Sequence, residues 1–315
     1  MSSTDKNAPP PEQAAQGAGK DRPDSGTKGA APGHAAQEAG QNSPHLEEAE
    51  QQQAADSAAL GPLVIHEIVR AEGEDELKRG FSGLAWSGLA AGLSIGFSFL
   101  VQAHLRAGLP DAPWRTLITS FGYSLGFLIA ILGRQQLFTE TTLTALIPFL
   151  TRRDLSTFRA TMRVWLIVLV ANLAGTVVFG FILTTPGLYE PSVTQAMIAL
   201  AEHTMAESFW LTVLRAGSAG WLIGLMVWLL PSAGPARPLI VILLTYVVAL
   251  FQLPHIVAGS VEAVYAVLSG HASIGDYFMR FLAPTLLGNV LGGTILAALL
   301  NHAPVAGEIR SRSAE

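Results

Sequence analysis

Six long apolar segments after residue 80 constrain this chain more than any other feature. They cover residues 81–104, 114–150, 157–183, 208–230, 238–270 and 277–300. Each is long enough to supply the ~20 residues that an α-helix needs to cross a bilayer. The sequence therefore predicts an all-α membrane protein with six transmembrane helices, surrounded by the lipid bilayer.

Polar residues interrupt the second and fifth segments, which are too long for one straight span. The interruptions are Arg134–Glu140 and Gln252–His255. Pro254 strengthens the second break, because proline lacks a backbone N–H and disrupts a helix interior. An ionisable side chain at membrane depth is costly and marks a functional site by default, so His255 is the first candidate site residue. We predict that both helices are broken.

The two breaks are spaced alike from two asparagines, which indicates an internal repeat. Phe138 lies 34 residues before Asn172, and His255 lies 34 residues before Asn289. Both asparagines are followed three positions later by glycine, and further glycines recur in the first and fourth segments, at Gly88, Gly92, Gly96, Gly217, Gly220 and Gly224. The offset of 117 residues predicts two inverted three-helix repeats.

Broken helices at corresponding positions of two halves point to a transport site near the bilayer midplane. Each half-helix would begin there with unpaired N–H groups and a partial positive charge, which attract anions. We expect Thr139 to cap the half-helix that starts near Glu140, either with a hydrogen bond toward His255 or as a plain cap without a role in the pore. Pro254 suits a helix start, where an N–H would be unpaired in any case. The pattern favours passage of small anions.

The other candidate residues each allow two interpretations. Leu137 and Phe138 form either a hydrophobic constriction or ordinary core. Asn172 and Asn289 either brace the broken segments, whose freed backbone groups need partners at membrane depth, or only pack helices together. Arg215 either attracts anions or extends its charge to the membrane interface.

Two carboxylates are unusual for an anion path. Glu140 and Glu262 either pair with Arg134 or Arg215 or reach the mouth of the pore. Burial and a helix N-terminus both disfavour a charged imidazole, so His255 is expected to be neutral at rest. We favour the hypothesis that it exchanges a proton with a weak-acid anion, which then crosses as the neutral acid. The alternative is a core histidine bonded to a carbonyl.

These residues resemble the formate/nitrite transporter family of bacterial inner-membrane anion channels. The likeness covers about residues 80–300 and includes Leu137-Phe138-Thr139, His255, Asn172, Arg215 and Gly288-Asn289-Val290-Leu291-Gly292-Gly293. It implies an aquaporin-like six-helix protomer, assembled as a pentamer with one pore in each protomer. Small monovalent anions or their acids would cross hydrophobic constrictions on either side of the histidine, without a cofactor or a metal.

The chain also departs from the family pattern. Pro254 stands where the family usually has Glu, and Gly220 replaces an Asn of the fourth helix that can bond the histidine. No Lys follows Lys78, so the usual lysine at the outer mouth is absent. The resemblance therefore implies a divergent member, with Pro254 and Gly220 supporting the broken helices.

Composition divides the chain into four parts. Residues 1–60 contain no Val, Ile, Phe, Tyr or Trp and are predicted to be a disordered polar tail. Residues 61–79 form a juxtamembrane amphipathic segment, 80–302 the transport domain, and 303–315 a C-terminal tail. Lys and Arg concentrate in alternate loops, which predicts a multi-pass protein with both termini in the cytoplasm.

Three rival functions remain open. An aquaporin-like channel for neutral solutes shares the inverted half-helices but would need Asn-Pro-Ala pairs, which this chain lacks. An intramembrane serine protease would use Ser218 and His255 as nucleophile and base. A non-conducting scaffold would bind a partner through its tail. Nothing suggests an enzyme more strongly than a transporter, and no basic face indicates nucleic acid.

Overall fold

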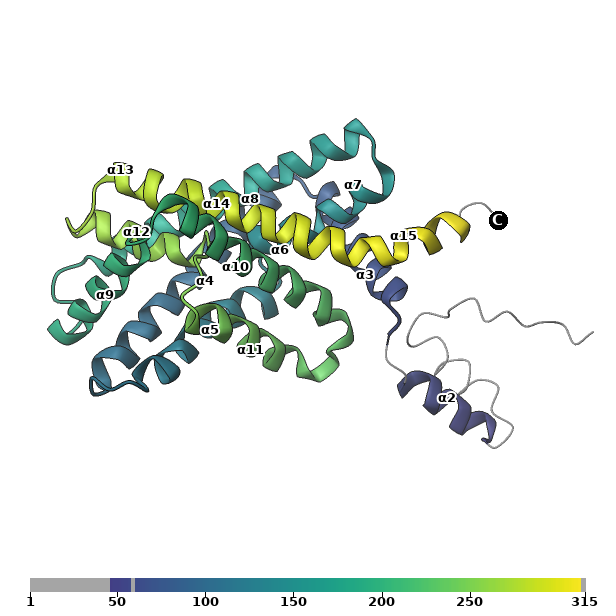
Figure 1. The fold of residues 1–315 in the computed structure, drawn as a ribbon, viewed down its shortest axis with the longest axis horizontal. Helices are drawn as coiled ribbons and strands as arrows, with labels where there is room; N and C mark the ends of the chain where they lie inside the picture. The colour runs from purple at the N-terminus through teal and green to yellow at the C-terminus, as the bar shows by residue number, and fades with distance from the viewer. Residues whose placement is uncertain (1–45, 58–59, 313–315) are drawn as a thin grey trace, which may run out of the picture.

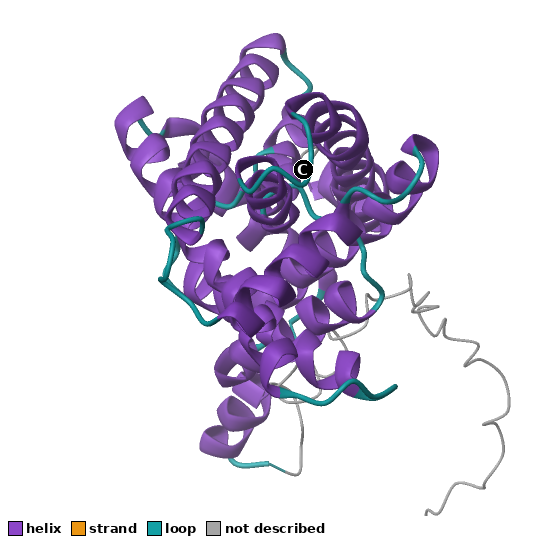
Figure 2. Ribbon diagram, turned by 90° about the vertical axis from the view of Figure 1, so that its left-hand side faces the viewer, coloured by secondary structure: helices purple, strands orange, loops and turns teal. Residues whose placement is uncertain are grey.

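Helices make up all the regular structure that the computed structural model describes, which is residues 46–57 and 60–312 (Figure 2). In these ranges five helices are long and apolar enough to cross a membrane. They are α4 (Phe81–Gly108), α5 (Arg115–Leu132), α8 (Leu155–Leu183), α10 (Phe209–Leu229) with its short extension to Ser232, and a last helix over Ile274–Gly307.

Two shorter sets of helices replace straight spans at the predicted breaks. After α5 the chain forms α6 (Phe138–Thr144) and α7 (Leu146–Arg152), and α11 (Arg237–Leu250) is followed by α12 (Ala258–Leu268). Each of these four helices is shorter than the ~20 residues of a span. The segments between them expose backbone groups that need partners within the protein.

The helices before the two breaks end in the same way. The chain turns at a residue with positive φ, which is 54° at Arg134 and 51° at Gln252. Beyond each turn a backbone bond reaches five residues back, from Gln135 N to Ala130 O and from Leu253 N to Val248 O, both at 2.9 Å. A left-handed residue with this bond is a common helix end, although glycine usually occupies the position. The two turns therefore share one backbone geometry.

Glycines bring the long helices into close contact at two matching places. α4 packs on α8, and α10 packs on α14 (Ala283–Leu291). A Cβ at Gly92 would lie 2.1 Å from the carbonyl oxygen of Asn172, and a Cβ at Gly220 would lie 2.3 Å from that of Asn289. Only glycine fits such contacts, which is how small residues bring membrane helices together.

The last helix is one continuous element in several parts. It comprises α13 (Ile274–Asp276), the π-helical η3 (Tyr277–Leu282), α14, the π-helical η4 (Gly292–Leu299) and α15 (Leu300–Arg312). Residues 303–312, predicted as a tail, instead continue this helix, because Val305 and its neighbour His302 are buried. Figure 1 shows α15 in yellow beside α3 (Pro62–Lys78), and the two helices are in contact.

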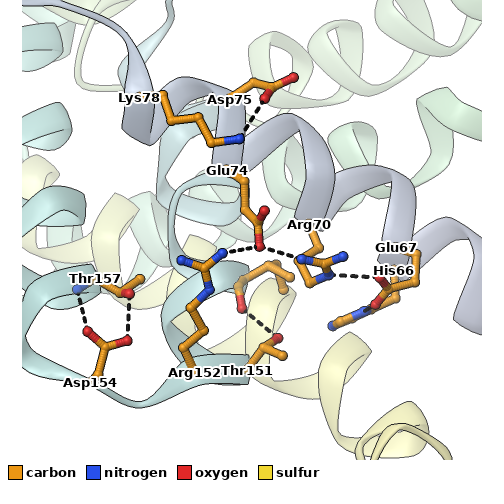
Figure 3. A network of polar contacts seen from close by, with 11 residues as sticks. His66, Glu67, Arg70, Glu74, Asp75, Lys78, Thr151, Arg152, Asp154 and Thr157 are labelled. Carbon is orange, nitrogen blue, oxygen red and sulfur yellow. Dashed lines mark hydrogen bonds and ion pairs between the residues drawn. The ribbon is translucent and has the colours of Figure 1, made fainter. Parts of the chain in front are cut away.

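Polar contacts hold α3 to the rest of the protein (Figure 3). Glu74 lies between Arg70 of the same helix and Arg152, whose Nη2 is 2.7 Å from the Glu74 carboxylate. α3 covers the predicted juxtamembrane segment 61–79, and Pro62 occupies its first turn.

Part of the predicted polar tail is helical. Helix α2 (Glu48–Ser57) lies within it and stands apart from the bundle in Figure 1. Its Ala, Gln and Glu residues are good helix formers, so low hydrophobicity does not prevent local helix formation. The prediction for residues 1–45 and 58–59 lies outside the described residues.

Three further elements complete the description of the chain. Helix α9 (Pro191–Thr204) follows α8 and packs on α4 and α12. The one-turn helices η1 (Leu230–Ser232) and η2 (Gly234–Ala236) connect α10 to α11.

Candidate functional site

One hydrogen bond joins the two helix breaks. The Nε2 atom of His255 and the hydroxyl oxygen of Thr139 are 2.8 Å apart. Both side chains are buried, with 1% of His255 and none of Thr139 exposed. The ring of Phe127 on α5 stands edge-on to the imidazole, with 5.0 Å between the ring centroids. The predicted bond between Thr139 and His255 is therefore present, in an apolar setting.

The hydrogen bonds of His255 assign its tautomer. Its Nδ1 atom accepts from the backbone N–H groups of Val257 at 3.3 Å and Ala258 at 3.2 Å, where α12 begins. A ring nitrogen that accepts carries no proton, so the ring hydrogen is on Nε2 and points to Thr139. The neutral ring therefore serves as the cap of α12 and as a donor to Thr139.

Asn172 closes the first break with three hydrogen bonds. Its Oδ1 atom accepts from Phe138 N at 2.8 Å. Its Nδ2 atom donates to Gly88 O at 2.7 Å and Gln136 O at 2.9 Å. The amide thus satisfies backbone groups that the broken helix leaves unpaired, in a place where water is excluded.

Asn289 makes the same three bonds at the second break. Its Oδ1 atom accepts from Ile256 N at 2.7 Å. Its Nδ2 atom donates to Ala216 O at 2.8 Å and Pro254 O at 3.0 Å. Pro254 therefore lies in the extended segment, where its carbonyl oxygen accepts a hydrogen bond. The sequence predicted a helix start at this proline, but α12 begins four residues later, at Ala258.

These bonds correct the predicted register by one residue. Phe138 lies 34 positions before Asn172, but its counterpart Ile256 lies 33 positions before Asn289. His255 therefore corresponds to Leu137, and not to Phe138 as the equal spacing suggested. The second break is thus one residue closer to its asparagine than the first break is. The sequence alone does not reveal which backbone N–H donates to the asparagine side chain.

Thr139 also differs from its predicted role as a cap. Helix α6 begins at Phe138 with Leu137 as its N-cap, and its first N–H donates to the side chain of Asn172 and not to Thr139. The hydroxyl of Thr139 lies inside the first turn and contacts His255 instead. Leu137 and Phe138 are both buried in the core, where Phe138 stands 6.1 Å from Trp165 between ring centroids.

Two cavities are lined by His255 or by a sequence neighbour of Thr139. The first, here called the α9 cavity, has a volume of about 100 Å³ and is lined by residues including Arg106, Tyr123, Arg215, His255 and Glu262. The second, the α3 cavity, has a volume of about 520 Å³, and its lining includes Glu72, Asp75, Glu76, Gln136 and Glu140. His255 lines the α9 cavity and Glu140, the residue after Thr139, lines the α3 cavity, so the bonded pair links the two linings.

The arginines near the cavities have other partners than predicted. Arg215 pairs with Glu207 at 2.9 Å and donates to Phe251 O at 3.0 Å. Arg134 pairs with Glu72 at 3.3 Å. Among the described residues, Glu140 and Glu262 form no ion pair with these arginines, and each lines a cavity.

The suggested protease pair does not form. Ser218 is exposed on α10, and its hydroxyl donates within the helix to Leu214 O at 3.5 Å. Both ring nitrogens of His255 form hydrogen bonds with other groups, which are Thr139 and the start of α12.

Sequence reasoning missed two polar partners of the cavities. The hydroxyl of Thr204 on α9 contacts the carboxyl group of Glu262. Glu76 on α3 accepts from Thr144 Oγ1 at 2.6 Å and from Gln136 Nε2 at 3.4 Å. These partners come from helices far apart in sequence, and no local pattern marks them.

Comparisons with known proteins agree with this architecture. The profile of the family described as Formate/nitrite transporter matches residues 63–303. Inner membrane protein YfdC of Escherichia coli is 36% identical over 250 residues, which cover 79% of this chain and 81% of that protein. Formate channel BtFdhC of Bacillus thuringiensis is 23% identical over 240 residues, covering 74% of this chain and 90% of that protein.

Solved structures share the fold. A structure described as an FNT family ion channel superposes with a TM-score of 0.68 at 17% identity, covering 76% of this chain and 98% of that one. A pentameric formate channel with formate bound superposes with a TM-score of 0.59 at 19% identity, covering 75% of this chain and 99% of that one. On the profile match and the relationship to YfdC, this chain belongs to the formate/nitrite transporter family.

Proposed function

We propose that this protein is a channel for small monovalent anions and their conjugate acids in the bacterial inner membrane. The observation that carries the proposal is the buried Thr139–His255 pair, in which His255 lines the α9 cavity and the residue after Thr139 lines the α3 cavity. A path closed by one buried hydrogen bond suits a small permeant species. Membership in a transporter family supports transport over catalysis.

We further propose that the six spans form two inverted three-helix halves. α11 and α12 together supply the fifth span, as α5 and α6 supply the second. The matching turns at Arg134 and Gln252 and the matching bonds of Asn172 and Asn289 support this arrangement. Such repeats place the transport site at the broken helices near the bilayer midplane.

The residues at the barrier act by hydrogen bonding and by excluding water. In the assigned tautomer Thr139 accepts from His255, which leaves its own hydroxyl hydrogen available to a passing anion. Phe127, Leu137 and Phe138 make the surrounding wall apolar and so form the constriction. A charged species crosses such a wall at high cost, so the neutral acid is the form that passes.

The α9 and α3 cavities lie on opposite sides of the membrane in this proposal. The α3 side faces the cytoplasm, because Arg79, Arg152 and Arg237 gather there and basic loops are retained inside. Arg215 then stands in the external cavity and draws anions toward the barrier. Residues beyond Arg312 and before α3 belong to the same cytoplasmic side.

A pentamer with one pore in each protomer agrees with the exposed surface. Large apolar side chains cover the outer faces of the long helices, among them Trp210, Leu214 and Phe181. Such faces suit lipid and neighbouring protomers. The pentameric formate channel of the same fold supports that number.

Flux measurements test the proposal. Proteoliposomes that contain the full-length protein should take up formate, nitrite or another small weak-acid anion faster than empty liposomes, and faster at lower pH. Replacing His255→Phe should remove this flux, because phenylalanine can neither cap α12 nor donate to Thr139. Glycerol flux serves as the control for a neutral-solute channel. Uptake of glycerol without any anion flux would disprove the proposal.

A further inference from the structure

Glu262 is a carboxyl group in the α9 cavity that the barrier itself does not use. It lies on α12 two turns beyond His255, and both residues line the same cavity. Its carboxylate contacts the hydroxyl of Thr204 on α9. Among the described residues, no ion pair is recorded for it. A charged carboxylate without a cation is costly at this depth, so the geometry favours its protonated form.

The bonds of Thr204 point the same way. Its Oγ1 atom is 3.2 Å from the carbonyl oxygen of Leu200, which can only accept, and it also contacts Glu262. A threonine hydroxyl has one hydrogen, which an ionised Glu262 would have to share with Leu200 O. Two full hydrogen bonds form when Glu262 donates to Thr204 and Thr204 donates to Leu200 O. That arrangement requires a proton on the carboxyl group.

The charged and titratable groups around Glu262 form no ion pair with it among the described residues. Arg215 is paired with Glu207, and His203 of α9 contacts Gln252 Oε1 at 2.9 Å. Other groups that face α12 or the cavity are Arg106 of α4, Tyr123 of α5, His255 and Tyr277 of η3, whose hydroxyl is 3.3 Å from Ser260 Oγ. The arginines draw an anion into the cavity, where the carboxyl proton of Glu262 is at hand.

We propose that Glu262 is the proton donor of the α9 cavity and protonates a weak-acid anion before it reaches the Thr139–His255 barrier. The O–H bond of the carboxyl breaks, and the proton forms a new O–H bond on the anion, which leaves as the neutral acid. The resulting carboxylate regains a proton from water on the external side. This inference rests on the proposed function, since it names the group that supplies the proton.

His255 is poorly arranged for this step. Its only basic nitrogen accepts from two backbone N–H groups at the start of α12, so protonating it would remove both bonds. A change in the charge of Glu262 disrupts no hydrogen bond to the backbone, because its carboxyl group contacts the hydroxyl of Thr204. Proton transfer is thereby separated from the barrier.

Glu262→Gln tests the assignment, because glutamine keeps the size and the hydrogen bond but has no acidic proton. We expect formate uptake at neutral pH to fall about tenfold, less than the ~10²–10⁴ of positioned acids in catalysis because water also supplies protons. The deficit should shrink as the external pH falls, because more formate then arrives protonated. Glu262→Asp should restore part of the flux.

The matched control is Glu202→Gln. Glu202 is an exposed carboxylate of α9 that pairs with His271 at 3.1 Å and does not line the α9 cavity, so its loss should leave both flux and pH profile unchanged. If the unmodified protein carries no anion, the proposed function fails, and this inference with it. If the unmodified protein carries formate and Glu262→Gln matches it at every pH, only the assignment of Glu262 fails.

A spectroscopic measurement covers the case in which Glu262→Gln does not fold. The infrared carbonyl band of a protonated carboxyl should be present in the unmodified protein at neutral pH. Thr204→Val, which removes the acceptor and keeps the shape of the side chain, should shift that band to higher frequency. A band that does not respond to Thr204→Val would overturn the proposal.

Discussion

The Nε2 atom of His255 lies 2.8 Å from the hydroxyl oxygen of Thr139, although the two residues are 116 positions apart. This contact ties the start of α6 to the extended segment before α12. Each helix break is therefore held by the other as well as by its own asparagine. Substitutions at this contact should affect both stability and transport.

Replacing Thr139→Val removes the oxygen that accepts from His255 and keeps the shape of the side chain. A buried N–H without a partner costs about 1–3 kcal/mol, so we expect a lower melting temperature and reduced anion flux. Thr141→Val is the matched control, because its hydroxyl bonds only to Phe138 O within α6. Equal effects of the two substitutions on flux would show that the contact with His255 has no role in transport.

Replacing Asn172→Ala or Asn289→Ala should destabilise the protein by similar amounts. Each asparagine makes the same three bonds to backbone groups at a break, and every group left unpaired costs about 1–3 kcal/mol. Tryptophan fluorescence during thermal unfolding in detergent measures the loss. Asn301→Ala removes one bond to Ala297 O near the end of the last helix and should cost much less. A large loss for only one of the two asparagines would contradict the equivalence of the breaks.

Two neighbouring glycines of α10 should respond differently to alanine. A Cβ at Gly220 would lie 2.3 Å from Asn289 O, whereas the nearest atom to a Cβ at Gly217 is Gly288 O at 3.8 Å. Gly220→Ala must push α10 from α14 and should cost about 1–3 kcal/mol or more, as overpacked cores do. Gly217→Ala should be tolerated. Thermal unfolding separates the two, and a stable Gly220→Ala variant with normal flux would refute the packing argument.

Alkaline pH should loosen α3. Burial raises the pKa of Glu76 to about 7, because the carboxylate of this α3 residue packs against Thr144 and Gln136 and is shielded from water. The stability that the neutral form contributes is full below the ordinary pKa of 4.5 and is lost as the pH rises through about 7. Hydrogen exchange of α3 amides, corrected for intrinsic rates, should therefore be faster at about pH 8.5 than at about pH 6. Glu76→Gln should remove the difference, and an unchanged pH response in that variant would assign it elsewhere.

Acidic pH should weaken the contact between α3 and α15. His66 is fully buried, and its Nε2 is 2.9 Å from Nδ1 of His302. Burial lowers the pKa of His66 below its usual 6.5, so its contribution to stability is present above pH 6.5 and is lost as the pH falls through the lowered value. Exchange in α3 should rise again at about pH 5, which His66→Gln should prevent. A steady decrease of exchange toward low pH would contradict this.

The sequence predicted the helical membrane fold because apolar length is a strong local signal. It also located both breaks, since Arg134 and Pro254 interrupt otherwise apolar segments. The sequence did not predict that Ile256, and not His255, donates to Asn289, because every residue except proline carries the same backbone N–H group. The Thr204–Glu262 contact was beyond reach too, because it joins residues 58 positions apart on different helices.

The last helix was harder to delimit than the others. Residues after Asn301 are mixed in polarity, and a proline at 304 suggests a helix end. Burial of His302 and Val305 against other helices outweighs that local signal. Tertiary packing commonly overrides propensity in this way.

The contact between α3 and α15 brings the first and last helices of the family domain to the same face. A peptide linker from α15 back to α3 would therefore join two helices that already contact each other. A circularly permuted protein, opened instead in the loop between α8 and α9, should keep both helix breaks intact. Affinity tags are best attached beyond Arg312, since a chain cut at Asn301 would remove His302, the hydrogen-bond partner of His66.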